Sequence, residues 1–293
     1  MWTGIELLYS LQEIRLEFPF LESLFSVLSS RVFYLALPIA LAFLFYWCID
    51  KRKGEIILMS CIPAMVFTMT SKYGFNQPRP WDVDPKIIEV EGINANGQAL
   101  PSGHTAMTVS SFIPAAAFFK SRVLESALLI LAAMIIVGRL VLCAHTPLDI
   151  IAGLAVGLLA VLLSWKAIGY AYRDEVRYHA VNLAYLIFFT ILFVSAIVLW
   201  DVDAVVISGY AGFFYGMMVG RTLEHIYVGF EVGEMSAREK ILRFVLGIIS
   251  GGLLFLLSIA LTPMFGTAIG GALMMLWCTF LYPLILERRR NYM

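Results

Sequence analysis

The sequence predicts an all-helical protein that crosses a membrane about nine times. Of its 293 residues, 60% are hydrophobic and only 14% are charged, and the mean hydropathy is +0.84. A water-soluble domain cannot bury so large an apolar fraction. The composition therefore indicates a polytopic bundle of transmembrane helices and excludes a soluble globular fold. We expect membrane lipids, and no nucleic acid, among its partners.

Residues 1–30 differ from the rest of the chain because charged side chains interrupt them. This stretch lacks a long apolar core, so it does not have the pattern of a cleavable signal peptide. It is typical of one or two amphipathic helices lying in the membrane interface. Its charged residues include Glu6, Glu13, Arg15, Glu17 and Glu22.

Nine later stretches are apolar and long enough to cross a bilayer as helices, for which roughly 17–25 residues are needed. The second and third are the shortest, so their ends are the least defined. The nine ranges are approximately 31–50, 55–71, 104–119, 123–143, 147–169, 179–200, 204–221, 241–261 and 265–286.

The basic residues test this count, because nine spans place alternate connections on opposite sides of the membrane. One side collects 15 of the 21 Lys and Arg residues, among them the clusters at 51–53 and 288–290. The positive-inside rule makes that side cytoplasmic. The C-terminus is then cytoplasmic, whereas the N-terminus, the 72–103 loop and the 143–147 turn lie outside. A plasma membrane or a bacterial inner membrane fits this arrangement.

Several ionisable residues remain at the outer ends of spans, where a charge is costly and marks a functional site by default. Simpler roles exist for some of them. A lone Lys72 could extend to the interface, Arg79 could be a loop cation, and Asp149 could cap a helix that begins near Pro147. Arg139 has no such structural explanation. The full set is Lys72, Arg79, His104, Arg139, His145 and Asp149.

Taken together, these residues have the chemistry of a phosphate site. Lys72, Arg79 and Arg139 could neutralise a phosphate dianion. The stretch "PSGH" at 101–104 precedes a span, so the backbone N–H groups of Ser102, Gly103 and His104 would form an anion site at a helix N-terminus. Two histidines could then supply a nucleophile and an acid. Asp149, four residues after His145, could orient that imidazole.

The sequence resembles the type 2 phosphatidic acid phosphatase superfamily, which has three ordered signatures. The first, Lys-x6-Arg-Pro, is met by Lys72, Arg79 and Pro80. The second, Pro-Ser-Gly-His, is met by residues 101–104.

The third signature, Ser-Arg-x5-His-x3-Asp, is met by Arg139, His145 and Asp149, but glycine stands at position 138 in place of the serine. The missing hydroxyl should weaken phosphate binding without abolishing the mechanism. The resemblance covers 72–149 and implies a six-helix core. We therefore expect an interfacial segment at 1–30, a phosphatase core at 31–200 and three additional spans at 201–293.

The resemblance implies a phosphatase that needs neither a metal nor another cofactor. His145 is expected to attack phosphorus and form a phosphohistidine, oriented by Asp149. His104 is expected to protonate the leaving group and then to activate water. The phosphate would be bound by Lys72, Arg79, Ser102, Gly103 and Arg139.

The sequence does not select one substrate. Polyprenyl diphosphate, phosphatidate and a sphingoid-base phosphate are candidates, and aromatic residues such as Trp81 mildly favour a lipid. The layout of spans is similar to that of sphingosine-phosphate phosphatase and of glucose-6-phosphatase. A phosphatase of a soluble sugar phosphate is the closest competitor. Two further functions stay open, namely a phosphotransferase and a non-catalytic phospholipid binder or transporter.

Residues outside the signatures are expected to be structural. His179 and His225 are assigned structural or interfacial roles. Arg221 and Glu224, one helical turn apart, are expected to pair with each other. The four cysteines have no disulfide-like spacing and are expected to be buried thiols. Small residues in the last two spans favour close helix packing, either within the chain or in a homo-oligomer.

Overall fold

Every regular element in the part of the chain that the structure describes is helical. The structure is a computed structural model that describes residues 4–93, 95, 97–262 and 265–291. Its α-helices are α1 (Ile5–Glu17), α2 (Pro19–Leu28), α3 (Leu37–Cys48), α4 (Lys51–Phe75), α5 (Pro80–Val83), α6 (Gly103–Phe118), α7 (Arg122–Val141), α8 (Pro147–Ala171), α9 (Glu175–Trp200), α10 (Ala204–Tyr227), α11 (Ala237–Leu261), α12 (Gly266–Leu276) and α13 (Tyr282–Asn291). Two π-helical turns, η1 (Val32–Ala36) and η2 (Trp277–Leu281), connect α2 with α3 and α12 with α13. The predicted helical bundle is confirmed.

Seven helical runs in the described residues are long and apolar enough to cross a membrane. The remaining two expected spans, 104–119 and 204–221, coincide with α6 and α10. Helix α6 has only 16 residues, nearly all of them buried, so it need not present an apolar surface to lipid. Helix α10 contains several glycines and ends near the buried charges Arg221 and Glu224. The nine expected spans are therefore more than the seven helical runs that are long and apolar enough to cross a membrane.

The start of the first span also differs from the expectation. Helices α2 and α3 form, with η1, one candidate span of 30 residues, Pro19–Cys48. Helix α2, expected in the interface, is thus part of this run. The proposed division of the chain at residues 30 and 200 stays a prediction.

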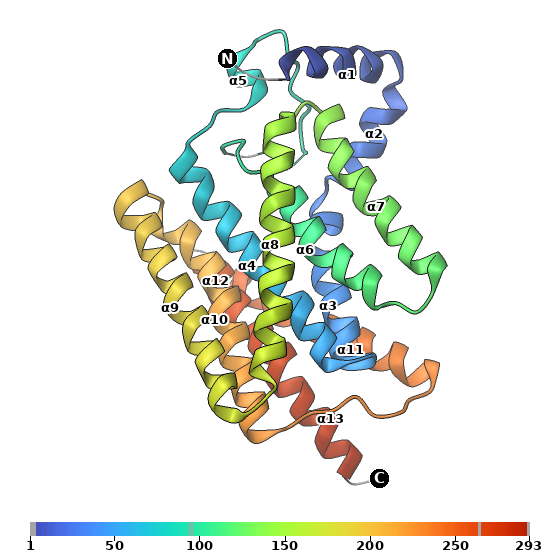
Figure 1. Ribbon diagram of the computed structural model, residues 1–293, viewed down its shortest axis with the longest axis vertical. Coiled ribbons are helices and arrows are strands. Elements are labelled where there is room, and N and C mark those ends of the chain that lie inside the picture. Colours follow the sequence, from blue (N-terminus) through green and yellow to red (C-terminus); the bar gives the residue numbers. More distant parts are fainter. Residues whose placement is uncertain (1–3, 94, 96, 263–264, 292–293) are drawn as a thin grey trace. The chain divides into compact units, whose positions relative to one another are not determined.

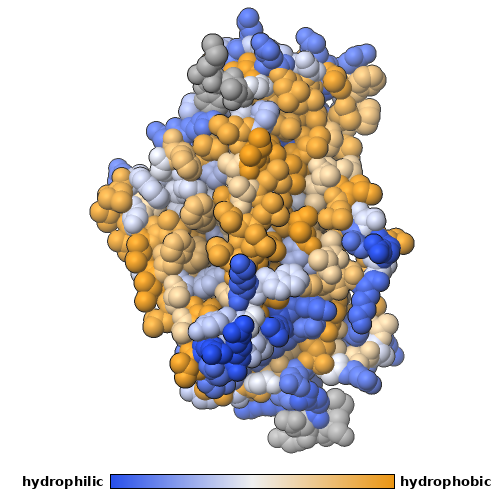
Figure 2. Space-filling view, viewed as in Figure 1, coloured by the Kyte–Doolittle hydropathy of each residue, from blue (hydrophilic) through white to orange (hydrophobic). Residues whose placement is uncertain are grey.

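The chain folds into two compact units. Met1–Leu41 and Ile57–Ser164 form unit 1, whereas Ala42–Ile56 and Trp165–Met293 form unit 2. Within unit 1, α6 packs against α7, and α1 and α2 also pack against α7 (Figure 1). The exposed face of α8 is largely apolar, as Figure 2 shows, and includes Leu148, Ile151 and Leu158.

Helix α1 holds the long connection between α4 and α6. The Gln12 side chain donates to the carbonyl of Lys86 (2.9 Å) and accepts from the Ile88 amide (2.7 Å). The buried Arg15 guanidinium also donates to the carbonyl of Ile88. The Tyr9 hydroxyl donates to Asp84, and this hydrogen bond holds the pKa of that carboxyl below its ordinary value. The connection is therefore fixed against an N-terminal helix.

Unit 2 contains a buried polar network. Arg221 Nη2 lies 3.0 Å from Glu55 Oε2, whereas Glu224 pairs with Lys51 (2.5 Å). The expected Arg221–Glu224 pair is therefore wrong. Sequence proximity cannot reveal the partners, which come from the start of α4. Asn182 also accepts from Arg221.

Glycines allow close helix contacts in unit 2. An ideal Cβ at Gly212 would lie 2.1 Å from the carbonyl oxygen of Ala268, and one at Gly216 would lie 2.5 Å from that of Ala272. The backbones of α10 and α12 are thus in contact. Packing within the chain therefore explains why small residues line this contact. The four cysteines are free and buried, as expected. A homo-oligomer stays a prediction.

Candidate active site

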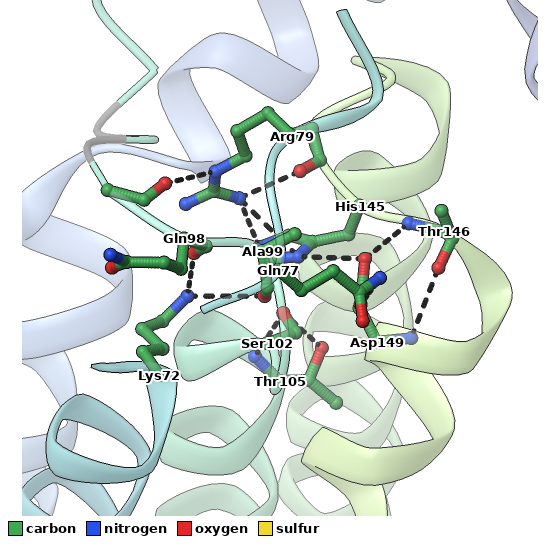
Figure 3. Close-up of polar contacts among 12 residues, drawn as sticks. Lys72, Gln77, Arg79, Gln98, Ala99, Ser102, Thr105, His145, Thr146 and Asp149 are labelled. Carbon is green, nitrogen blue, oxygen red and sulfur yellow. Dashed lines mark hydrogen bonds and ion pairs between the residues drawn. The ribbon is translucent and has the colours of Figure 1, made fainter. Parts of the chain in front are cut away.

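The predicted site residues of unit 1 gather where four helices end or begin. Lys72 lies in the last turn of α4, and Arg79 follows in the connection to α6. Gly103 begins α6, Arg139 lies in the last turn of α7, and Asp149 lies in the first turn of α8. Figure 3 shows side chains from three of these regions meeting in one polar cluster.

His145 stands between a cation and an anion at the centre of this cluster. Arg79 Nη1 lies 3.0 Å from His145 Nε2 and 3.4 Å from His145 Nδ1. His145 Nδ1 also lies 3.6 Å from Asp149 Oδ2. All three residues are deeply buried, since their exposed fractions are 4%, 1% and 0%. Because the Asp149 carboxylate can only accept, we assign the His145 proton to Nδ1, which faces Asp149. Nε2 then carries the lone pair that a nucleophile needs.

The surroundings also keep His145 uncharged. Burial, together with the nearby charges of Arg79, Lys72 and Arg139, holds the pKa of the His145 imidazole well below its ordinary value. Removal from water penalises the charged imidazolium, and the cations repel it. At neutral pH the residue is therefore neutral and able to act as a nucleophile.

Asp149 is held by the residue that precedes α8 and by the connection between α4 and α5. Its Oδ2 accepts from the Thr146 amide (2.7 Å), and its Oδ1 accepts from the Gln77 side chain (3.4 Å). The Asp149 amide donates in turn to the Thr146 hydroxyl (3.4 Å), so the two residues cap the start of α8 reciprocally. Capping and orientation of His145 are thus compatible roles for one carboxylate.

Lys72 and Arg79 are tied to backbone carbonyls around the site. Lys72 Nζ donates to the carbonyls of Gln98 and Ala99 (Figure 3). Arg79 Nε donates to the carbonyl of Gly97 and its Nη1 to that of Ala144, both at 2.8 Å. Lys72 is only 5% exposed, so its side chain points into the protein and does not extend to the interface.

Arg139 has guanidinium donors that are not used in hydrogen bonds to the described residues. Its side chain is fully buried, and its Nη1 donates to the carbonyl of Ile93 (3.0 Å). Its Nε and Nη2 atoms have no hydrogen-bond partner among the described residues. Buried donors without partners are costly, and two adjacent guanidinium N–H groups match two oxygens of one phosphate.

The N-terminus of α6 departs from the expected anion site in one respect. The Ser102 amide does not point outward, because it donates to the carbonyl of Asp149 (3.0 Å). The Ser102 hydroxyl caps α6 by accepting from the amide of Thr105 (3.4 Å) and from its hydroxyl (3.0 Å). An ideal Cβ at Gly103 would meet only Thr68 Oγ1, at 4.0 Å, so there is space beside that backbone.

His104 is held by residues that no signature contains. Its Nε2 lies 3.0 Å from the carbonyl oxygen of Ser29, and its ring lies 4.1 Å from the ring of Tyr34, centroid to centroid. The three cations Arg139, Arg79 and Lys72 lie near both His104 and His145. The two imidazoles therefore share one group of cations. Sequence reasoning missed Ser29 and Tyr34, because neither has a distinctive local signal.

Gly138 lies against Phe25 of α2. An ideal Cβ at Gly138 would be 2.7 Å from Phe25 Cδ1 and 3.2 Å from Cγ. The aromatic ring thus takes the space next to the position where the signature has its serine. Phe25 is a further residue that the sequence did not single out.

The structure brings the predicted residues of the three signatures into one buried cluster, while their individual catalytic and binding roles stay predictions. Such a cluster can bind an oxyanion, attack it with an oriented imidazole and transfer a proton. A family model described as the PAP2 superfamily matches residues 53–173 of the chain. A second, described as the transmembrane extension of PAP2 superfamily phosphatases, matches residues 208–290. No curated protein and no solved structure matches the chain.

Proposed function

Because the chain belongs to the PAP2 superfamily and is an integral membrane phosphatase of that family, we propose that it hydrolyses a lipid phosphate or diphosphate monoester through a phosphohistidine at His145. The observation that carries this proposal is the buried contact of His145 with both Arg79 and Asp149. With the Nδ1 proton facing Asp149, Nε2 of a neutral imidazole keeps its lone pair beside Arg79, and Arg79 can turn to a bound phosphate.

The reaction follows from the positions of the groups. His145 Nε2 attacks phosphorus, a P–N bond forms, and the P–O bond to the leaving group breaks while His104 protonates the leaving oxygen. Water then attacks the phosphohistidine, gives a proton to His104 and breaks the P–N bond, which releases phosphate. Asp149 stabilises the imidazolium character that develops on His145.

The phosphate would be bound mainly by the cations. Arg139 offers its two unpartnered N–H groups, and Arg79 turns its Nη1 from His145 to the phosphate oxygens. Lys72, the Ser102 hydroxyl and the backbone at Gly103 complete the site. These fixed positive charges stabilise the charge on the equatorial oxygens of the transition state. The expected independence from metals rests on this arrangement.

A lipid substrate is favoured by the surface next to the site. Leu148, which directly precedes the fully buried Asp149, is 48% exposed, and Ile151 is 61% exposed. Apolar surface suited to acyl or prenyl chains therefore begins within one helical turn of the reacting groups. The distribution of basic residues supports a site on the extracytoplasmic side.

The test is phosphate release by the protein purified in detergent, with EDTA present. The panel contains polyprenyl diphosphate, phosphatidate, a sphingoid-base phosphate and glucose 6-phosphate. His145→Ala should abolish release, whereas the control His179→Ala, a half-exposed histidine of α9, should keep it. Rapid quenching should trap an acid-labile phosphoryl label on the parent protein and none on His145→Ala.

Each contrary result has a defined meaning. Parent-like release by His145→Ala would overturn the proposal. Preference for glucose 6-phosphate would replace the lipid by a soluble substrate. A trapped label that is released only when an acceptor alcohol is added would indicate a phosphotransferase. Binding of lipid phosphate without a label or release would indicate a non-catalytic binder or transporter.

A further inference from the structure

The N-terminal run Pro19–Ala36 lies outside both matched ranges, 53–173 and 208–290, yet it forms one side of the candidate active site. Helix α2 packs against α7 and η1 packs against α6. Through these contacts the run brings the Ser29 carbonyl and the Tyr34 ring to His104. Among the described residues, the Ser29 carbonyl is the hydrogen-bond partner of the His104 side chain.

The Ser29 carbonyl determines which nitrogen of His104 can exchange a proton with substrate. A carbonyl oxygen can only accept, so the 3.0 Å contact requires the proton on Nε2. Nδ1 is then the nitrogen that carries the exchangeable proton in the acid form of His104. The ring is therefore anchored at one nitrogen and free to react at the other.

Tyr34 restricts the remaining freedom of this ring. Rotation about the Nε2 anchor would tilt the imidazole, but the Tyr34 ring lies 4.1 Å from it at an interplanar angle of 33°. Tyr34 belongs to the π-helical turn η1, and such turns change the direction of side chains relative to a regular α-helix. The wider turn places the tyrosine ring over His104 while Ser29 lies one turn earlier.

We propose that Tyr34 is a positioning residue for the reaction, which clamps His104 against the Ser29 carbonyl so that Nδ1 faces the leaving oxygen. This inference rests on the proposed function. It assigns to the N-terminal run a role in proton transfer, beyond anchoring the protein in the membrane.

The test compares two soluble substrates that differ in their need for an acid. The leaving group of octyl phosphate is an alkoxide, which needs protonation. The leaving group of p-nitrophenyl phosphate is a stabilised phenolate, which does not. The quantity to compare is kcat/KM, because it reports steps up to formation of the phosphohistidine and excludes its hydrolysis, in which His104 acts again. General acid catalysis contributes roughly 10²–10⁴-fold.

Tyr34→Leu should lower kcat/KM for octyl phosphate by about 10- to 100-fold, part of the general-acid contribution, and change the value for p-nitrophenyl phosphate by less than about threefold. Tyr34→Phe, which keeps the ring, should restore most of the loss. Phe33→Leu, a substitution in the same turn, is the matched control and should leave both values near those of the parent. Tyr34→Met replaces Tyr34→Leu if the latter does not fold.

His104→Gln provides the second comparison. If Tyr34 acts through His104, the double variant His104→Gln/Tyr34→Leu should be no slower than His104→Gln alone. Equal losses on both substrates, additive losses in the double variant, or a full loss in Tyr34→Phe would overturn the inference. Turnover of p-nitrophenyl phosphate that survives in His145→Ala would instead overturn the proposed function, so the two failures are distinguishable.

Discussion

Gly138 shows how one residue adapts the candidate site to the N-terminal run. A side chain at this position would collide with Phe25, whose Cδ1 lies 2.7 Å from an ideal Cβ. We expect Gly138→Ser to lower the free energy of unfolding by about 1–3 kcal/mol, as overpacking of a filled site does. Unfolding in detergent measures this change.

The Phe25→Ala variant tests whether the Phe25 ring causes this loss of stability. In Phe25→Ala the same Gly138→Ser substitution should cost less, because the clashing ring is gone. An equal cost in both backgrounds would show that the backbone of α7, and not Phe25, excludes the serine.

The surroundings of His145 predict how the activity depends on pH. In the proposed mechanism the neutral form of His145 is the nucleophile, and its pKa is lowered by burial and by Arg79, Lys72 and Arg139. Activity should therefore persist as the pH falls past the ordinary histidine pKa of about 6.5, and should be lost only at lower pH. In Arg79→Gln one repelling charge is absent, so the acidic limb of kcat/KM should move to higher pH. An acidic limb that does not move would contradict this assignment.

The residues of the three signatures could be predicted because their spacing is local. The site contacts that sequence reasoning missed join distant positions: Ser29 and His104 are separated by 75 residues, and Gln77 reaches Asp149 across 72. Such contacts depend on how helices pack, which no local pattern encodes. The expectation that the Ser102 amide faces an anion is wrong for the same reason, since its acceptor belongs to α8.

Helices α6 and α10 show where hydropathy is a poor guide. Both overlap predicted spans, but α6 is short and buried, and α10 continues past its predicted span and carries Arg221 and Glu224. A helix surrounded by protein can replace apolar residues by polar or small ones without exposing them to lipid. Overall helical character was predictable from composition, whereas the number of helices long and apolar enough to cross a membrane was not.

The pair that joins α4 to α10 predicts a large effect on stability. Arg221 and Glu55 are 2% and 1% exposed, and breaking a buried pair leaves an uncompensated charge. Glu55→Leu should therefore lower the free energy of unfolding by about 3–5 kcal/mol. Glu55→Leu/Arg221→Leu should recover much of this loss, because the lone buried charge is absent. Additive losses in the double variant would show that the pair is not coupled.

The sidedness of the membrane protein can be tested with single reporter thiols, because the four native cysteines are buried. Glu91→Cys and Glu234→Cys are matched substitutions at exposed acidic positions in two different connections. An impermeant maleimide should label Glu91→Cys in intact cells, and Glu234→Cys only after the membrane is opened. Labelling of both in intact cells, or the reverse order, would contradict the expected orientation.

The hydrogen bond from the Ser102 amide to the Asp149 carbonyl has a consequence for redesign of the enzyme. It joins the two signatures through main-chain atoms, and Gly153, where an ideal Cβ would lie 2.7 Å from the Ser102 carbonyl, keeps α8 next to α6. Side-chain exchanges around the site that keep this hydrogen bond should therefore leave the alignment of these two helices intact. Variants made to alter substrate preference should therefore retain this glycine.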